Sequence, residues 1–206
     1  MADIEQPQIY LITPPDFELS SFPDKLAAVL GAHDVACVRL ALATSDAERV
    51  SRAADAVRAV CHEHDVALVV QDHLKLVETL GLDGVHLSDG SRTVRYARKE
   101  LGDEAIIGAF CRNSRHDGIS AAEGGADYVS FGPVTSGPLG DGSQAEEDLF
   151  SWWSDMIEVP VVAEGGLSAG RVTALSQITD FFGIGEEIWA HDDPAAALKS
   201  LLAGTS

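Results

Sequence analysis

The sequence predicts an α/β protein, a compact (β/α)8 barrel of the TIM type. Eight short apolar runs recur along the 206 residues, and amphipathic helical patterns lie between them. One repeat therefore spans about 26 residues, enough for a strand, a helix and two short loops. Most runs are apolar throughout rather than alternating, as expected of parallel strands buried on both faces. No linker interrupts the pattern, so we expect one domain over residues 1–206.

The expected strands are the eight apolar runs. They are Gln8–Thr13, Val35–Leu42, Val66–Gln71, Gly84–Leu87, Ile106–Phe110, Tyr128–Phe131, Pro160–Ala163 and Asp180–Ile184. The expected helices are Asp24–Gly31, Ser45–His64, His73–Leu80, Arg92–Leu101, Ser114–Glu123, Asp148–Met156, Ser168–Ser176 and Pro194–Ala203. Ser45 and Glu48 predict a capping box at the start of the second helix. Glycines suited to left-handed C-caps stand at Gly31, Gly81, Gly102 and Gly124.

A doubly wound open sheet is the alternative fold. Such a sheet usually carries a glycine-rich phosphate loop after an early strand. Here the first expected strand is followed by Pro14, Pro15 and Asp16 instead. The sequence therefore favours the closed barrel.

The composition excludes several classes of partner. With 14 basic and 33 acidic residues, the net charge is −19, which repels nucleic acids and anionic lipid surfaces. No apolar run approaches the roughly 20 residues that span a bilayer, and Met1–Tyr10 has no basic segment typical of a signal peptide. Three cysteines do not make a disulfide framework, so we expect a cytoplasmic protein. The expected partner is a small-molecule substrate. Assembly into a homo-oligomer is left open.

In a barrel of this type, the ligand site lies at the carboxyl ends of the strands. That rule selects a short set of candidates: Arg39, Gln71, Asp72, His86, Asp89, Phe110, Cys111, Arg112, Gly132, Pro133, Glu164, Gly165, Gly166, Gly183, Gly185, Glu186 and Glu187. For several of them a structural role competes with a functional one. Asp72 is either a metal ligand or the N-cap of a helix, and Arg39 either binds a ligand or pairs with an acid. His86 is interpreted as a packed histidine.

Several segments together resemble the thiamine-phosphate synthase and thiazole tautomerase superfamily, over nearly the whole chain. They are Ile9–Thr13, Gln71-Asp72, Asp83–Leu87, Ile106–Gly108, Gly124–Pro133 and Pro160–Leu167. In that family the synthase joins an aminopyrimidine pyrophosphate to a thiazole phosphate, and Mg²⁺ holds the leaving pyrophosphate. The resemblance thus implies an enzyme of thiamine biosynthesis.

The resemblance also assigns roles to single residues. Asp72 would bind Mg²⁺, with Asp89 close to the position of the second carboxylate and Gln71 beside them. Arg39 would bind the pyrophosphate. Gly165 and Gly166 would bring backbone N–H groups to the thiazole phosphate. Three further glycines at strand ends, Gly132, Gly183 and Gly185, complete the expected substrate site.

The chain departs from the family pattern at several of these places. The second-strand motif lacks its Gln and its Lys, the latter replaced by Ala41. Ser91 stands at the second Mg²⁺ carboxylate, Phe110 at a Ser and Arg112 at the tautomerase His. The loop that usually carries Lys reads Gly137–Gly140, and the Ser of the last phosphate loop is Glu186, followed by Glu187.

These departures keep a second hypothesis open. Five acids fall at strand ends: Asp72, Asp89, Glu164, Glu186 and Glu187. Like charges about 4 Å apart cost up to ~4 kcal/mol each at an effective dielectric of about 20, so this mouth would repel a phosphate. The barrel would then be a degenerate or repurposed protein that binds a metal or a cationic small molecule.

Overall fold

The predicted strands close into one parallel barrel. The computed structural model describes residues 6–135 and 143–204, and in this part of the chain every strand pairs with its neighbours in sequence order. The strands are β1 (Gln8–Ile12), β2 (Val35–Leu40), β3 (Ala67–Gln71), β4 (Gly84–Leu87), β5 (Ile106–Phe110), β6 (Tyr128–Phe131), β7 (Val161–Glu164) and β8 (Phe181–Ile184). The barrel closes where β1 pairs with β8, with Tyr10 opposite Gly183. The (β/α)8 prediction is confirmed, and the open sheet is wrong.

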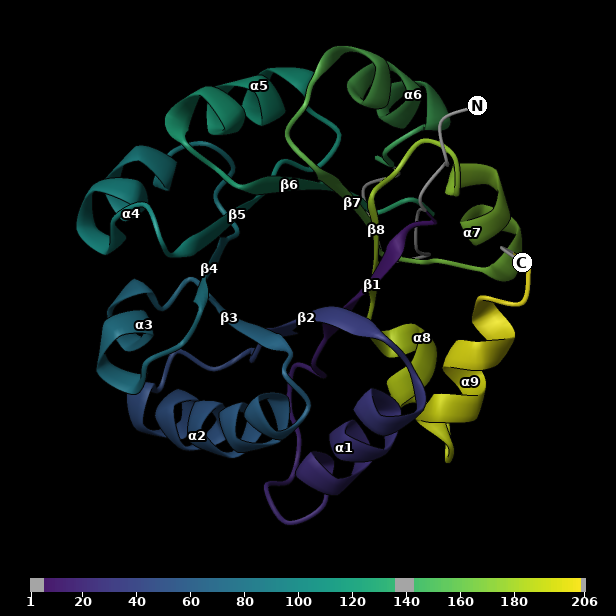
Figure 1. Ribbon diagram of the computed structural model, residues 1–206. Coiled ribbons are helices and arrows are strands. Elements are labelled where there is room, and N and C mark those ends of the chain that lie inside the picture. The colour runs from purple at the N-terminus through teal and green to yellow at the C-terminus, as the bar shows by residue number, and fades with distance from the viewer. Residues whose placement is uncertain (1–5, 136–142, 205–206) are drawn as a thin grey trace.

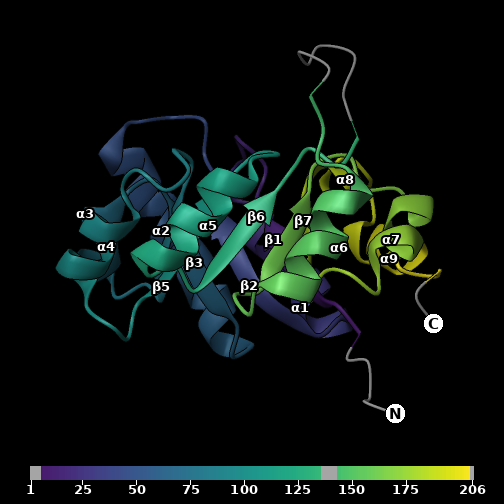
Figure 2. The same cartoon turned by 90° about the horizontal axis from the view of Figure 1, so that it is seen from above.

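The helices form a ring outside the barrel, as the view along its axis shows (Figure 1). They are α1 (Phe22–Ala32), α2 (Ala47–Glu63), α3 (Leu74–Leu80), α4 (Val94–Leu101), α5 (Arg115–Gly124), α6 (Glu147–Met156), α7 (Ala169–Leu175), α8 (Glu186–Trp189) and α9 (Pro194–Leu201). The perpendicular view shows α5 and α6 alongside β6 (Figure 2). Among the described residues, no helix is long and apolar enough to cross a membrane.

One helix, α8, was not predicted from the sequence. α8 has four residues and follows β8 after Gly185 alone, so it is too short to show a helical period. The other eight helices and all eight strands begin and end within two residues of their predicted bounds.

The predicted helix caps are partly wrong. Asp46, not Ser45, caps α2, because its carboxylate accepts the N–H groups of Glu48 and Arg49. Asp46 can accept both donors at once, which the predicted Ser45 capping box would not do.

At the other helix ends the glycine rule holds in part. Gly81 follows α3 in the predicted left-handed conformation, with φ 61° and ψ 49°. Gly102 follows α4 with a positive φ of 76° but a ψ of −173°, so it is not a left-handed cap. Gly31 is still helical in α1, and α5 runs through Gly124, so that Gly125 takes the left-handed position with φ 98°.

The core has two layers. Inside the barrel, beneath the carboxyl ends of the strands, the interior is filled by Tyr10, Cys37, Val69, Tyr128 and Val162. Gly108 in β5 makes room for the largest of them, because a Cβ there would lie 2.0 Å from Cζ of Tyr128. A second, larger apolar cluster lies between the strands and the surrounding helices. The carboxyl ends of the strands are thus left for polar side chains.

Three aspartates fasten the opposite, amino-terminal end of the barrel. Each directly precedes an even-numbered strand, and its carboxylate accepts a backbone N–H from the strand before. The bonds run from Leu68 N to Asp83 (2.7 Å), from Ile107 N to Asp127 (2.7 Å) and from Val161 N to Asp180 (2.8 Å). Each aspartate also donates its own N–H to the carbonyl of that same residue. These paired bonds fix the register at the start of the strands.

Replacing Asp83 by Ala tests this clamp. The N–H of Leu68 loses a charged acceptor, so we expect the free energy of unfolding to fall by about 1–2 kcal/mol. Urea unfolding measures the change. Asp103→Ala, which removes the same charge from an exposed loop, serves as the control. Equal effects of the two variants would show that the Asp83 clamp does not stabilise the barrel.

Candidate active site

A buried ion pair crosses the mouth of the barrel. Arg39 on β2 donates two hydrogen bonds to Glu164 at the end of β7, one from each terminal nitrogen, at 3.0 and 3.1 Å. Arg39 is 5% exposed and Glu164 9%. Such a two-point contact between guanidinium and carboxylate is both strong and directional. It joins strands that are not neighbours, because β1 and β8 lie between them.

A chain of hydrogen bonds leads from this pair into the barrel. Nη1 of Arg39 lies 2.6 Å from Nε2 of His86, whose Nδ1 lies 2.9 Å from the Tyr128 hydroxyl. That hydroxyl lies 2.6 Å from the hydroxyl of Tyr10. Because arginine can only donate, Nε2 of His86 accepts and Nδ1 carries the proton given to Tyr128. The pattern requires a neutral His86.

The pKa values of these groups agree with that pattern. Burial, reinforced by the charge of Arg39, lowers the pKa of His86 well below its ordinary 6.5. Burial disfavours the charged form of Arg39, but Glu164 favours it, and the pKa of Arg39 is raised. Burial also raises the pKa of Tyr10 and of Tyr128. Arg39 is therefore charged, whereas His86, Tyr10 and Tyr128 are neutral.

The predicted metal residues Asp72 and Asp89 follow the ends of the neighbouring strands β3 and β4. The carboxylate of Asp72, just after β3, accepts hydrogen bonds from the backbone N–H (2.8 Å) and the hydroxyl (2.6 Å) of Ser88, just after β4. Asp89 follows Ser88 and accepts a hydrogen bond from the Thr93 hydroxyl. Asp72 does not cap α3, because His73 occupies that position without a side-chain cap. The N-cap interpretation of Asp72 is therefore wrong. Asp72 and Asp89 are connected through Ser88, which bonds Asp72 and directly precedes Asp89.

The region of Asp72 and Asp89 has one feature that suits a cation. Oδ1 of Asp89 is buried and has no hydrogen-bond partner among the described residues. Within residues 6–135 and 143–204, no three His, Cys, Asp or Glu side chains are grouped to hold a metal. Mg²⁺, however, commonly takes one or two carboxylates and completes its shell with water and substrate phosphates. Asp72 and Asp89 fit that requirement, with Gln71 at the adjoining end of β3.

On the other side of the mouth, three backbone N–H groups converge. Gly166 N and Leu167 N, from the loop after β7, both donate to Oε1 of Glu187 at 3.0 Å, and Gly185 N donates to Oε2 at 2.8 Å. We call these three donors the cradle. Gly165 and Gly166 have φ values of 83° and 79°, which favour glycine and let the loop turn inward.

A cavity of about 280 Å³ opens beside the cradle. Its walls come from the carboxyl ends of β1, β2, β7 and β8 and from α8. Four of the predicted substrate-site glycines line it: Gly165, Gly166, Gly183 and Gly185. Gly132 lies behind the wall, since a Cβ there would meet the carbonyl oxygen of Glu164 at 2.3 Å. Gly183 has a spatial role too, because a Cβ would lie 2.9 Å from that of Glu164.

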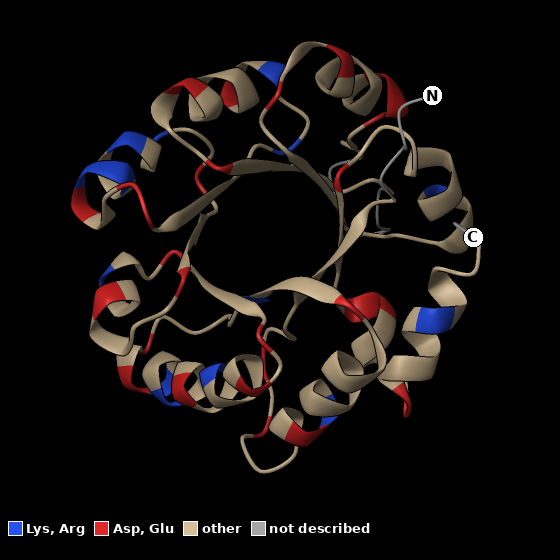
Figure 3. Cartoon of the chain, viewed as in Figure 1, with Lys and Arg blue, Asp and Glu red and all other residues tan. Residues whose placement is uncertain are grey.

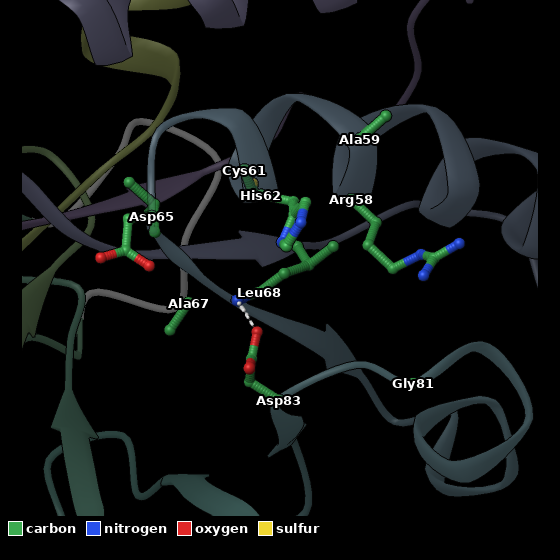
Figure 4. Close-up of a pocket in the computed structure, with 10 residues that line it drawn as sticks. Arg58, Ala59, Cys61, His62, Asp65, Ala67, Leu68, Gly81 and Asp83 are labelled. Carbon is green, nitrogen blue, oxygen red and sulfur yellow. Dashed lines mark hydrogen bonds between the residues drawn. The ribbon is translucent and has the colours of Figure 1, made fainter.

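A second cavity, of about 530 Å³, lies at the opposite end of the barrel (Figure 4). It is bordered by the end of α2 and the start of β3, and its carboxylate from Asp83 is engaged with Leu68 N. Function in this fold lies at the carboxyl ends of the strands, so the smaller cavity is the candidate site.

Most basic side chains lie away from the mouth. Figure 3 shows Lys and Arg mainly on the outer helices, whereas several acids stand near strand ends. Arg112, just after β5, is exposed. The segment Gly137–Gly140, where the family usually carries a Lys, lies outside the described residues.

The cysteines are not nucleophiles of this site. Cys37, Cys61 and Cys111 are free and buried. Burial raises the pKa of Cys111 to about 12, so its thiol stays protonated. Cys37 and Cys111 belong to the apolar clusters inside and around the barrel.

Sequence reasoning missed Tyr10 and Tyr128 as members of the polar network. Both lie in strands with aromatic or apolar neighbours, so the sequence indicates only that they belong to the core. The one available signal was the small residue Gly108 next to Tyr128 in the sheet, which leaves space for a large ring inside the barrel.

The fold and the site define a class: a (β/α)8 barrel that presents a backbone N–H cradle and a pair of carboxylates at the carboxyl ends of its strands. Comparison with known proteins narrows this class. Residues 9–180 match the family model of thiamine monophosphate synthase. The chain is 39% identical over 194 residues to the thiamine-phosphate synthase of Rhodospirillum centenum, covering 93% of this chain and 94% of that protein.

A second relative and one solved structure are also similar to the chain. The thiamine-phosphate synthase of Erythrobacter litoralis is 37% identical over 203 residues, with 95% of both chains covered. Thiamine phosphate pyrophosphorylase from Pyrococcus furiosus has the same fold, with a TM-score of 0.81 over 94% of this chain and 93% of that one at 21% identity. The chain belongs to the thiamine monophosphate synthase family.

The buried His86 predicts a pH dependence of stability. Because folding lowers its pKa, the unfolded chain takes up a proton below about pH 6.5 that the folded chain does not. The free energy of unfolding should therefore fall as the pH drops below 6.5, with up to about 1.4 kcal/mol per pH unit from this residue. Urea unfolding between pH 5 and 8 should show a flatter profile for His86→Gln than for the wild type.

The exposed His191 provides the control for this measurement. We expect His191→Gln to keep the wild-type slope. If His86→Gln also kept it, His86 would not be held neutral by the network.

Proposed function

We propose that this protein is a thiamine-phosphate synthase, which joins an aminopyrimidine pyrophosphate to a thiazole phosphate. A C–N bond forms between the methylene carbon of the pyrimidine and the thiazole nitrogen. The bond from that carbon to the pyrophosphate oxygen breaks, and its electron pair leaves with pyrophosphate. The carrying observation is the similarity to thiamine-phosphate synthases, which extends over 93% of the chain and supports a function in thiamine biosynthesis.

We assign the pyrophosphate side of the reaction to the Asp72–Asp89 corner. The unpartnered Oδ1 of Asp89 supports this assignment, since a buried carboxylate oxygen calls for a donor or a cation. Asp72 and Asp89 would hold Mg²⁺, and Gln71 would lie beside them. When bound, the metal neutralises charge that develops on the leaving pyrophosphate. Holding Asp72 in place is the task of Ser88, which donates to both carboxylate oxygens.

Arg39 contributes a fixed positive charge beneath the mouth. Glu164 takes hydrogen bonds from both of its terminal nitrogens, and Nε is buried with no partner among the described residues. In this proposal Arg39 stabilises negative charge on the pyrophosphate through space, from its place beneath the mouth. Its rigidity suits the role, because a preorganised charge needs no rearrangement during the reaction.

The thiazole side of the site is assigned to the glycine-lined cavity. Gly165, Gly166, Gly183 and Gly185 line this space, and Gly132 allows the ends of β6 and β7 to approach each other.

We place the protein in the cytoplasm, since its three cysteines are free and buried, which suits a reducing compartment.

The rival hypothesis of an acidic, cation-binding mouth loses part of its basis. It rested on five acids at strand ends, but the carboxylate of Glu164 is paired with Arg39. That of Glu187 accepts three backbone N–H groups. Neither is a free negative charge, so the synthase is the better-supported function.

An end-point assay for thiamine phosphate tests the proposal. Purified protein receives both substrates and Mg²⁺, and Asp72→Asn serves as the matched variant. Asn tolerates the backbone at this position, where φ is 60°, and can still accept from Ser88, so the variant removes mainly the charge. We expect product from the wild type and at least tenfold less from Asp72→Asn, or about 1.4 kcal/mol in the barrier.

Two results would contradict this account. Folded wild-type protein that forms no product would reject the synthase activity. Full activity of Asp72→Asn would remove Asp72 from the site while leaving the activity itself intact.

A further inference from the structure

The cradle is already filled by a side chain of the protein. Glu187, in the first turn of α8, spreads its two carboxylate oxygens over the three N–H groups of Gly166, Leu167 and Gly185. The donors come from two separate loops, after β7 and after β8. The arrangement is therefore a pocket for an anion built between loops.

The chemistry of the cradle suits a phosphate equally well. Several backbone N–H groups that point at one spot form a concavity that binds phosphate oxygens or carboxylates. A phosphate that entered would need the same three donors that Glu187 now uses. The two anions would also repel each other at this distance, so they cannot share the cradle.

Among the described residues that line the cavity, none is Lys or Arg, and Glu186 and Glu187 both line it. Arg39 lies below, with both terminal nitrogens on Glu164. The binding of a phosphate here therefore depends on backbone donors, and Glu187 controls access to them.

We propose that Glu187 is a specificity-determining residue that competes with the phosphate group of the acceptor substrate for the cradle. A phosphorylated ligand binds only after the Glu187 side chain has left its three donors. In the wild type this competition weakens phosphate binding by at least tenfold relative to an open cradle. The identity of the acceptor as a thiazole phosphate rests on the proposed function, whereas the competition itself does not.

A purely structural role for Glu187 makes a different prediction. If its carboxylate only fastens the loop after β7 to α8, its removal loosens both loops and improves the binding of no anion. The two roles are therefore separated by a gain of binding, which damage to the structure does not produce.

The test measures binding of inorganic phosphate by isothermal titration calorimetry. The variants are Glu187→Ala, which opens the cradle, and Glu187→Gln, which keeps a side chain there but turns an amide NH2 toward donors. Glu186→Gln is the control, because it removes the same charge from the same cavity without opening the cradle. Thermal unfolding confirms that each variant is folded.

We expect Glu187→Ala to bind phosphate at least tenfold more tightly than the wild type. Glu187→Gln should show a smaller gain, and it carries the test if the Ala variant does not fold. Glu186→Gln should change binding less than threefold. Unchanged phosphate binding in the folded Glu187 variants, or an equal gain in Glu186→Gln, would overturn the proposal.

This experiment is independent of turnover. If the synthase assay fails and Glu187→Ala still gains phosphate binding, the competition stands and the proposed reaction falls. If the wild type makes thiamine phosphate and the Glu187 variants gain nothing, the reaction stands and the competition is rejected.

Discussion

The site depends on one buried ion pair, Arg39 with Glu164. A guanidinium and a carboxylate withdrawn from water are tolerated only when each satisfies the other, and here two parallel hydrogen bonds do so. The pair spans β2 and β7, so it ties together two strands that have no backbone bonds to each other. Burial and the charge of Arg39 together keep His86 neutral. Hydrogen bonds then run from His86 to Tyr128 and from Tyr128 to Tyr10.

Small residues around the pair are a consequence of this constraint. Gly183 leaves space for the side chain of Glu164, and Gly132 allows its backbone to approach β6. Because the ion pair occupies the centre of the mouth, ligands can bind only at its two sides. One is the carboxylate corner at β3 and β4, and the other is the cradle after β7 and β8. A two-part substrate set fits this division, with a metal-bound leaving group on one side and an acceptor on the other.

The sequence predicted the barrel well because the signal for it is local. Continuous apolar runs mark each buried strand, and periodic helices separate them, so bounds agree within two residues. α8 was missed because four residues carry no period. Asp72 and Asp89 were proposed through motif resemblance, because no local pattern marks a metal ligand. The bond between Arg39 and Glu164 was not predictable, since their separation of 125 residues hides which acid the arginine meets. The orientation of Glu187 was likewise hidden, because it depends on how a loop after another strand turns its N–H groups.

A double-mutant cycle on Arg39→Met and Glu164→Leu tests the central claim most directly, with urea unfolding as the measurement. Each single change leaves one buried charge without its partner, so each should lower the free energy of unfolding by about 3–5 kcal/mol. The double variant leaves no unpaired charge. Its free energy of unfolding should therefore be no lower than that of the less stable single variant. Additive losses in the double variant would contradict the claim that this pair organises the mouth of the barrel.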